Sequence, residues 1–293
     1  MKDFDTKRFR YDGSEPIKIK KAPTKVDDLY EDDVHYEALL RQQAAEIDKW
    51  QNRMYAHNRY GLLVIFQALD AAGKDGTIQN VFTGTNPAGV RVYSFKRPTD
   101  QELDHDFLWR SWRELPERGT IGIFNRSYYE EVLVTKVHPE ILTDSQRLPE
   151  KQTDDLDKLF KRRYDAICNM EKFLHHNGFP VVKFFLHVSK EEQADRLIAR
   201  ITNPEKNWKF EEGDVKEREF WSDYQKAYED AINETATDNA PWYVIPADDK
   251  KNMRLLVGRI IIDELQKLPI KEPEPDEQRF KELQNLIPII QAQ

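Results

Sequence analysis

Apolar residues occur along the chain in short continuous runs, separated by longer stretches in which they recur at helical spacing. The short runs are rich in β-branched and aromatic residues and lack polar alternation, which is typical of strands buried on both faces of a sheet. The expected strands cover 61–67, 90–95, 120–125, 181–188 and 242–246.

The intervening stretches have the periodicity of amphipathic helices, and the first of them begins at two aspartates suited to helix capping, Asp32 and Asp33. Strands that alternate with helices predict an α/β fold with a doubly wound parallel sheet of about five strands. The carboxyl ends of those strands should meet at one edge, where ligands bind. The expected helices cover about 32–57, 76–83, 101–114, 127–134, 154–177, 189–201, 214–235 and 250–267.

The chain divides into three parts. Residues 1–30 form an extended basic arm, which either packs on the body with solvated lysines or contacts an anionic partner. Residues 31–268 form the α/β domain, with a helical lid at about 190–225 around the polar segment TNPEKNWKFEEG. Residues 269–293 read as a linker followed by a terminal helix over about 276–291.

Composition narrows the possible functions. Hydrophobic residues make up 39% and charged residues 33% of the chain, and the formal net charge is −8. A negative chain is a poor general binder of nucleic acid, so no nucleic-acid partner is expected. No apolar run is long enough for a bilayer and the N-terminus lacks a signal peptide, so no membrane role is expected. Together with one cysteine, Cys168, these features favour a cytoplasmic protein.

The segment after the first strand has the character of a phosphate-binding loop. It reads ALDAAGKDGT from Ala68 to Thr77 and stands between the best strand and a helix. Backbone amides at a helix N-terminus bind anions, glycines allow close approach, and a lysine supplies a mobile positive charge. The expected phosphate- and nucleotide-binding residues here are Ala71, Ala72, Gly73, Lys74, Asp75, Gly76 and Thr77.

The loop departs from the general pattern G-x-x-x-x-G-K-[ST] in three places. Ala68 replaces the first glycine, Asp75 replaces the serine or threonine, and Asp70 adds a carboxylate. A carboxylate within an anion-binding loop repels the ligand unless a cation mediates. Asp70 is therefore predicted to hold Mg²⁺, which uses few carboxylates together with phosphate oxygens.

A second group of polar residues follows the strand at 120–125. Asn125 stands where other phosphate-loop enzymes place a magnesium-supporting carboxylate, and Arg126 could hold a phosphoryl group bidentately. Glu130 and Glu131 open the next helix, where acidic side chains also simply favour the helix dipole. Of the two, Glu130 is the candidate for ordering the metal or the acceptor.

Four linked motifs resemble the family-2 polyphosphate kinases, in order and spacing, from about residue 30 to 268. They are AxDAAGKDGT, FNRSYYEEVLVTKVHPE, WKF and APWYVIPADDK. Ala68, Asp75 and Asn125 look like the class III subgroup, which phosphorylates both AMP and ADP.

The resemblance implies a thymidylate-kinase-like P-loop fold with a lid, dependence on Mg²⁺ with Mn²⁺ as a substitute, and a homo-oligomer. The implied partners are inorganic polyphosphate and adenine nucleotides, with guanine nucleotides as a second option. It gives functional positions to Asp70, Lys74 and Arg126, and leaves a metal role for Asn125 in doubt. The candidates for the polyphosphate channel are Lys136, Arg196, Arg200, Lys206 and Lys209.

The expected reaction moves the terminal phosphate of polyphosphate reversibly to ADP and AMP. Two other functions are compatible with the sequence. One is an ATP-dependent nucleoside monophosphate kinase on the same fold, and the other is a non-catalytic sensor of nucleotide or polyphosphate.

Overall fold

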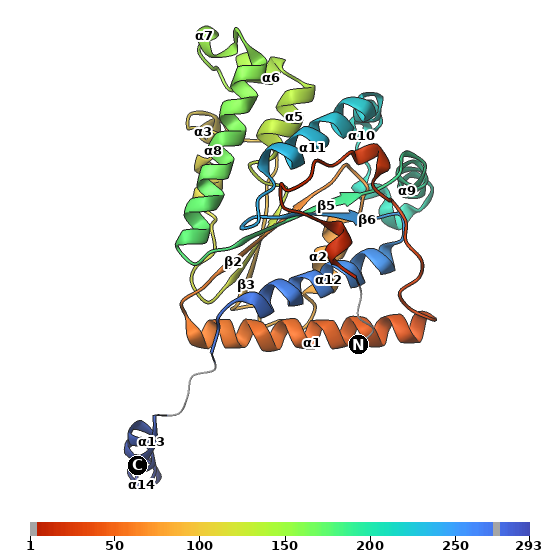
Figure 1. The fold of residues 1–293 in the computed structure, drawn as a ribbon. Coiled ribbons are helices and arrows are strands. Elements are labelled where there is room, and N and C mark those ends of the chain that lie inside the picture. The colour runs from red at the N-terminus through yellow and green to blue at the C-terminus, as the bar shows by residue number, and fades with distance from the viewer. Residues whose placement is uncertain (1–4, 272–275) are drawn as a thin grey trace.

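The computed structural model of the chain describes residues 5–271 and 276–293. Its centre is a six-stranded sheet of order β1-β6-β5-β2-β4-β3, in which all neighbours except β1 and β6 are parallel (Figure 1). The strands are β1 (Arg10–Tyr11), β2 (Leu62–Gln67), β3 (Val90–Ser94), β4 (Ile121–Asn125), β5 (Val181–His187) and β6 (Trp242–Pro246). The α/β fold and its five parallel strands are confirmed.

Helices cover both faces of the sheet (Figure 1). The α-helices before the lid are α1 (Asp33–His57), α2 (Lys74–Val81), α3 (Asp100–Leu103), α4 (Trp109–Trp112), α5 (Glu130–Val137), α6 (Glu140–Asp144), α7 (Glu150–Thr153) and α8 (Leu156–His176). The later ones are α9 (Lys190–Thr202), α10 (Glu212–Glu217), α11 (Trp221–Thr235), α12 (Lys250–Lys267), α13 (Glu277–Gln284) and α14 (Ile287–Gln291). Short 3₁₀ turns are η1 (Lys7–Phe9), η2 (Ile19–Lys21), η3 (Pro204–Lys209) and η4 (Arg218–Phe220).

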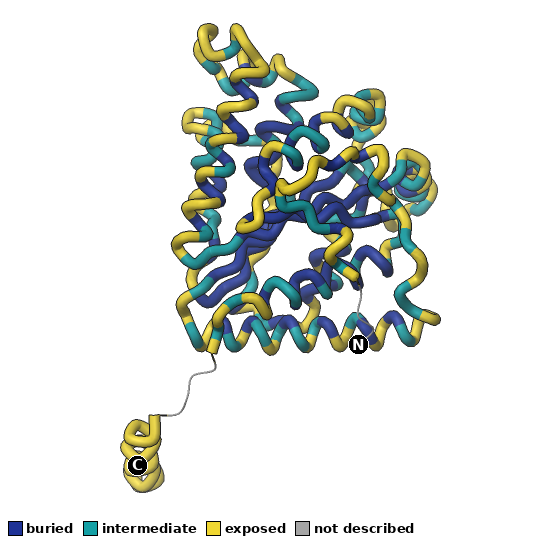
Figure 2. The backbone as a smooth tube through the Cα atoms, viewed as in Figure 1, coloured by how far each residue is buried: buried dark blue, intermediate teal, exposed yellow. Residues whose placement is uncertain are grey.

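Burial follows this layering. The strands β2 and β5 are buried at every position (Figure 2). The apolar run of β2 predicts this burial, whereas β5 also buries Lys183 and His187. One apolar cluster packs α1, α2 and α12 against one face, and a second packs α5, α8 and α11 against the other. Among the described residues, no helix is both long and apolar enough to cross a bilayer.

The N-terminal arm packs on the body by a few apolar side chains. Phe9, Ile17 and Ile19 are buried, whereas Lys18, Lys20, Lys21 and Lys25 are exposed. The arm also supplies the strand β1, which pairs antiparallel with β6 and was not predicted. Two residues are too short a run to carry a periodic signal.

Four predicted helices differ from those of the structure, and the one expected over about 276–291 is divided into α13 and α14. The helix expected at 101–114 is two short helices, because the Asp106 side chain accepts the amide of Leu108 at 2.9 Å and closes a turn between them. The helix expected at 127–134 begins at Glu130 instead, after a tight turn at the end of β4. The helix expected at 214–235 is divided into α10, η4 and α11.

The order of the strands brings two distant segments together. β2 lies between β4 and β5, and Phe66 pairs in register with Asn125. The segments that follow β2 and β4 therefore leave the same edge of the sheet side by side. The parallel sheet thus sets Ala68–Gly73 beside Asn125–Tyr129 across 50 residues or more of chain.

A buried polar network fixes the second of these segments from behind. Lys183 of β5 donates to Glu171 of α8 at 2.6 Å, and both side chains are almost fully buried. The hydroxyls of Tyr128 and Tyr129 donate to the same carboxylate at 2.9 and 2.8 Å. The Thr235 hydroxyl lies 2.9 Å from that of Tyr129 and thereby adds α11 to the network. The turn after β4 is thus tied to three other elements.

Removing one partner of this ion pair should destabilise the protein strongly. Lys183→Met leaves Glu171 buried without its cation, which costs about 3–5 kcal/mol of unfolding free energy. The double variant K183M/E171Q removes both charges and should recover part of that loss. Urea denaturation of the parent protein and of both variants measures the free energy of unfolding of each.

The exposed pair Arg91–Glu117, 2.8 Å apart, provides a matched control. Arg91→Ala should cost less than about 1 kcal/mol, because exposed pairs contribute little. Equal losses for Arg91→Ala and Lys183→Met would contradict the assigned importance of the buried pair.

Candidate functional site

The segment between β2 and α2 forms the predicted phosphate loop. Ala71 and Gly73 have left-handed φ angles of 63° and 107°, and only the glycine adopts this region at no steric cost. The first amides of α2 have no intrahelical acceptor and are available to an anion at the mouth of the loop. Lys74 reaches back over the loop and donates to the carbonyl of Ala68 at 2.9 Å.

The remaining predicted loop residues divide into packed and exposed positions. Ala72 and Thr77 are buried, and the Thr77 hydroxyl donates to the carbonyl of Gly73 at 2.9 Å. The Thr77 side chain therefore supports the start of α2. Gly76 lies next to Arg254 of α12, which would stand 3.4 Å from an added Cβ.

Arg126 joins the loop to the segment after β4. Its guanidinium donates to Asp70 at 2.7 Å and to Glu130 at 3.4 Å. The two carboxylates, Glu130 first, raise the pKa of Arg126 above its usual value against the effect of burial. Burial lowers the pKa of Lys74, and the nearby Arg126 adds to that effect. Arg126 also has a left-handed φ of 63°, a strained conformation that is common at functional sites.

Asn125 contacts the loop as well, but through its amide nitrogen. The side chain donates to Asp75 at 2.6 Å and to Ser94 at 3.4 Å. In this arrangement Asn125 holds the carboxylate of Asp75 at the end of β4. Its predicted role as a metal ligand stays a prediction.

The described residues contain no group of three or more His, Cys, Asp or Glu side chains arranged around a metal ion. Asp70 nevertheless fits an ion that arrives with a substrate, because Mg²⁺ is commonly bound by one or two carboxylates plus phosphate oxygens. Its carboxylate is about one-third exposed and stands at the mouth of the phosphate loop. The donor set therefore suits a metal shared with phosphate.

The predicted lid residues lie in different environments. Arg196 is buried and donates to backbone carbonyls beneath the phosphate loop, and Arg200 pairs with Asp214 at 2.9 Å. Lys206 and Lys209 lie in η3, where Lys209 stacks on the exposed ring of Trp208. Lys136 pairs with Asp230 of α11 at 2.8 Å. Among the interactions described for this part of the chain, none joins Lys206, Lys209 or Lys136 to a residue of the phosphate loop.

Several residues beside the loop were not predicted. They line a small cavity of about 40 Å³ together with Asp70, Arg126 and Glu130. They reach it from α9, the lid and α11, and no motif in the sequence marks them. The additional side chains include Gln193, Asp214, Glu217, Arg218, Trp221, Tyr224 and Tyr228.

A larger cleft of about 1010 Å³ opens on the other side of Arg126. Its lining combines cations with acidic and apolar side chains from the β3–α3 segment, α5 and the α6 region. The cations are Lys96, Arg97, Arg110, Arg126 and Arg147. This volume is suited to a nucleotide-sized ligand.

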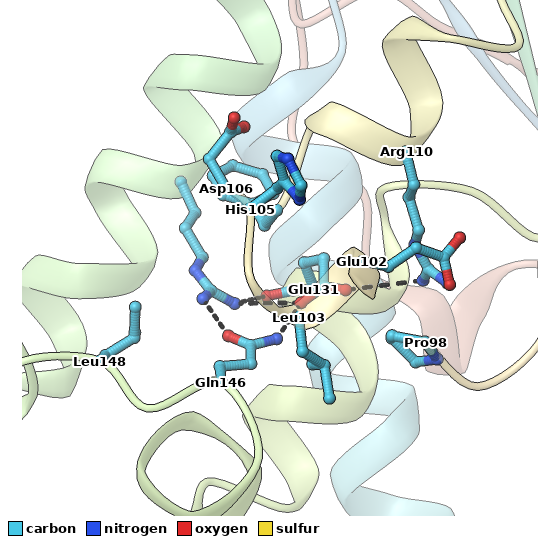
Figure 3. Close-up of a pocket in the computed structure, with 11 residues that line it drawn as sticks. Pro98, Glu102, Leu103, His105, Asp106, Arg110, Glu131, Gln146 and Leu148 are labelled. Atoms are coloured by element: carbon cyan, nitrogen blue, oxygen red, sulfur yellow. Dashed lines mark hydrogen bonds and ion pairs between the residues drawn. The ribbon is translucent and has the colours of Figure 1, made fainter. Parts of the chain in front are cut away.

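The floor of that cleft continues into the pocket of Figure 3, which has a volume of about 140 Å³. Glu131 lies there between Arg110 and Arg163, each 3.6 Å away, and also accepts from Gln146. Burial raises the pKa of Glu131, and the two arginines oppose that effect. Glu131 therefore holds the walls of the pocket together, beyond the helix-dipole effect expected from the sequence.

Comparisons with known proteins now identify the family. The model of the family described as polyphosphate kinase 2 matches residues 30–273. The chain belongs to the polyphosphate kinase 2 family. It is thus a member of a family of phosphotransferases on a P-loop kinase fold, as the four motifs indicated.

The names of individual proteins similar to this chain agree with this family. The chain is 51% identical over 279 residues to an ADP-polyphosphate phosphotransferase of Rhodopseudomonas palustris, covering 95% of this chain and 96% of that protein. It is 45% identical over 230 residues to an AMP/ADP-polyphosphate phosphotransferase of Meiothermus ruber, covering 78% and 81%. The crystal structure of polyphosphate kinase 2 from Arthrobacter aurescens TC1 superposes with a TM-score of 0.83 at 35% identity, covering 94% of this chain and 95% of that one.

Asp214 has a raised pKa, which makes the stability of the protein depend on pH. Burial, reinforced by the charge of Asp70, raises this pKa from 3.8 to about 6 despite the ion pair with Arg200. The folded protein therefore keeps the proton on Asp214 at pH values where the unfolded chain has lost it. Stability from this group is present below about pH 4 and is lost as the pH rises through about 6.

Asp214→Asn should consequently become more stable relative to the parent protein as the pH rises from 4 to 7. The gain at pH 7 should be on the order of 1–3 kcal/mol. Urea denaturation of both proteins at several pH values measures the difference. A difference that does not change with pH, or that shrinks towards pH 7, would show that the Asp214 pKa is not raised.

Proposed function

We propose that this protein transfers the terminal phosphate of inorganic polyphosphate to ADP and to AMP, reversibly and with Mg²⁺. The observation that carries the proposal is the cluster of Asp70, Lys74, Arg126 and Glu130 at a phosphate loop, in a chain of the polyphosphate kinase 2 family. Relatives named for phosphate transfer from polyphosphate to ADP and to AMP support the choice of substrates.

The chemistry depends on positioning and on neutralising charge. The transferring phosphoryl group carries charge on its equatorial oxygens, and the attacking and leaving oxygens must stand in line. Loop amides and Lys74 bind one phosphate, and Arg126 contacts the group in transfer from the opposite side. Asp70 would hold Mg²⁺, which would supply positive charge to the phosphate oxygens. Mn²⁺ has similar ligand preferences and should substitute.

No strong general base is needed, because the acceptor is already an anionic phosphate oxygen. Glu130 instead fixes the guanidinium of Arg126, to which it is hydrogen-bonded at 3.4 Å. The cleft of about 1010 Å³ next to Arg126 is the proposed site of the acceptor nucleotide. Closure of the lid would exclude water and limit hydrolysis.

The lid cations Arg200, Lys206 and Lys209 remain proposed contacts of polyphosphate, as does Lys136 in α5. A homo-oligomer and a cytoplasmic location also remain proposals. Light scattering of the purified protein tests the homo-oligomer. A mass near 34.7 kDa, that of a single chain, would contradict it.

The proposed reaction predicts that the protein forms ATP from ADP and long-chain polyphosphate with no ATP added. Lys74→Ala should lower kcat/KM by about 10²–10³-fold, because it removes a cation aimed at the transferring charge. Chromatography of the nucleotides, with protein free of adenylate kinase, measures the products.

The same assay with AMP should yield ADP. Product formation that requires ATP as phosphate donor would favour the nucleoside monophosphate kinase. Binding of polyphosphate without any turnover would favour the sensor.

Removal of divalent metal should abolish turnover, and Mg²⁺ or Mn²⁺ should restore it. Asp70→Asn keeps the size of the side chain but weakens the ligand, so half-maximal activity should need about 10- to 100-fold more Mg²⁺. Glu205→Gln, at an exposed position in η3, is the matched control and should leave the Mg²⁺ requirement unchanged. An unaltered Mg²⁺ titration for Asp70→Asn would remove Asp70 from the metal site.

A further inference from the structure

The carbonyl groups of the phosphate loop are bound from behind by one helix. Gln193 of α9 donates to the carbonyl of Asp70 at 2.9 Å. One turn later, Arg196 donates to the carbonyl of Ala71 at 3.3 Å and to that of Ala72 at 2.7 Å. Two side chains spaced i, i+3 on α9 thus bind three successive loop carbonyls.

Both side chains are buried, and their hydrogen-bonding groups are in use. Gln193 is 4% exposed and Arg196 is 7% exposed. The other arm of the Arg196 guanidinium donates to the carbonyls of Ala247 and Asp248 at 2.6 and 2.9 Å, and its Nε donates to Glu192 at 2.7 Å. Five acceptors surround this one guanidinium, which leaves it no free face for a phosphate chain.

We propose that Gln193 and Arg196 are positioning residues, which clamp the phosphate loop so that its carbonyls point away from the ligand and its amides point towards it. A peptide has its carbonyl and its amide on opposite sides, so holding the carbonyls of Asp70 and Ala72 behind the loop presents the amides of Ala71 and Gly73 at its mouth. The amide of Ala72 instead donates to the carbonyl of Leu69 at 3.3 Å, which closes the turn of the loop. The clamp also acts on Ala71, whose left-handed φ of 63° is unfavourable for a residue with a Cβ. Such conformations persist only where surrounding contacts determine them.

The clamp also connects the loop to η4, on the far side of the lid segment in the sequence. Arg218 of η4 donates to Gln193 Oε1 at 2.6 Å and to the carbonyl of Lys190 at 3.1 Å. Gln193 therefore accepts from η4 with one end of its amide and donates to the loop with the other. A movement of η4 would act on the Asp70 carbonyl through this single side chain.

This assignment rests on the proposed function and differs from the sequence-based prediction that Arg196 contacts polyphosphate. The two roles differ in their dependence on salt. Each cation that neutralises a phosphate adds to the slope of log(kcat/KM) against log[salt], by about 0.7–0.9 per contact in nucleic acids. A positioning residue contributes nothing to that slope.

The experiment compares Arg196→Met with Lys209→Met, an exposed lid position proposed to contact polyphosphate. For Arg196→Met, kcat should fall about 10²-fold, as expected when a loop is misplaced, while the salt slope for polyphosphate stays that of the parent protein. Added guanidinium should restore part of kcat, and Arg196→Lys should not, because one ammonium cannot span the four carbonyls. Lys209→Met should reduce the slope and leave kcat less affected.

Hydrogen exchange gives a readout that does not depend on turnover. Arg196→Met should speed exchange of amides in the 68–76 segment and leave that of β5 unchanged. If Arg196→Met does not fold, Gln193→Met carries the test, with the same unchanged slope and faster loop exchange but a smaller loss of kcat.

A reduced salt slope for Arg196→Met, or exchange in the loop equal to that of the parent protein, would overturn the clamp. Absence of any polyphosphate-dependent turnover in the parent protein would instead refute the proposed function. The exchange measurement would still decide the clamp in that case.

Discussion

The ion pair between Asp70 and Arg126 is the constraint on which the rest of the site depends. A loop that presents amides to an anion gains nothing from a carboxylate of its own unless a positive charge stands beside it. Arg126 provides that charge from the neighbouring strand at 2.7 Å. The pair can form only because β2 and β4 run parallel and end at the same edge of the sheet. The order of the strands is therefore a requirement of the chemistry.

The position of Arg126 depends in turn on what lies behind it. The buried contacts of Tyr128 and Tyr129 with Glu171, and of Glu171 with Lys183, fix the turn that follows β4. This network adds rigidity at a place where the backbone is strained. On the other side of the site, α9 fixes the phosphate loop through its carbonyls. Both segments that carry the candidate site residues are thus held by buried polar contacts, and the side chains of Asp70 and Arg126 are left partly exposed.

Much of this architecture could be predicted from the sequence, because local patterns determine it. The buried strands are rich in apolar residues, and the loop residues from Asp70 to Lys74 lie next to one another in the chain. The resemblance of four motifs also placed Arg126 at the site. The clamp of Gln193 and Arg196 could not be predicted, because their partners are backbone carbonyls more than 120 residues away. A carbonyl has no sequence signature, so a basic residue near a lid looks like a ligand for phosphate until its partners are known.

The protein is negatively charged overall, although its proposed substrate is a polyanion. A chain with a net charge of −8 should repel a polyanion unless positive charge is concentrated where the polyanion binds. Here two of the cations around the loop are already paired with carboxylates, as in Arg126–Asp70 and Arg200–Asp214. On the proposed function, a phosphate chain that reached them would replace one anionic partner with another, so the cations would be neither left buried without a partner nor newly desolvated. The displaced carboxylates would lose their cationic partners. Asp214, with its pKa of about 6, can take up a proton more readily than an ordinary aspartate. Asp214, one of the acidic residues that dilute the positive charge of the lid in the sequence, pairs with Arg200 and on the proposed function would hold this cation in place until a phosphate chain replaced it.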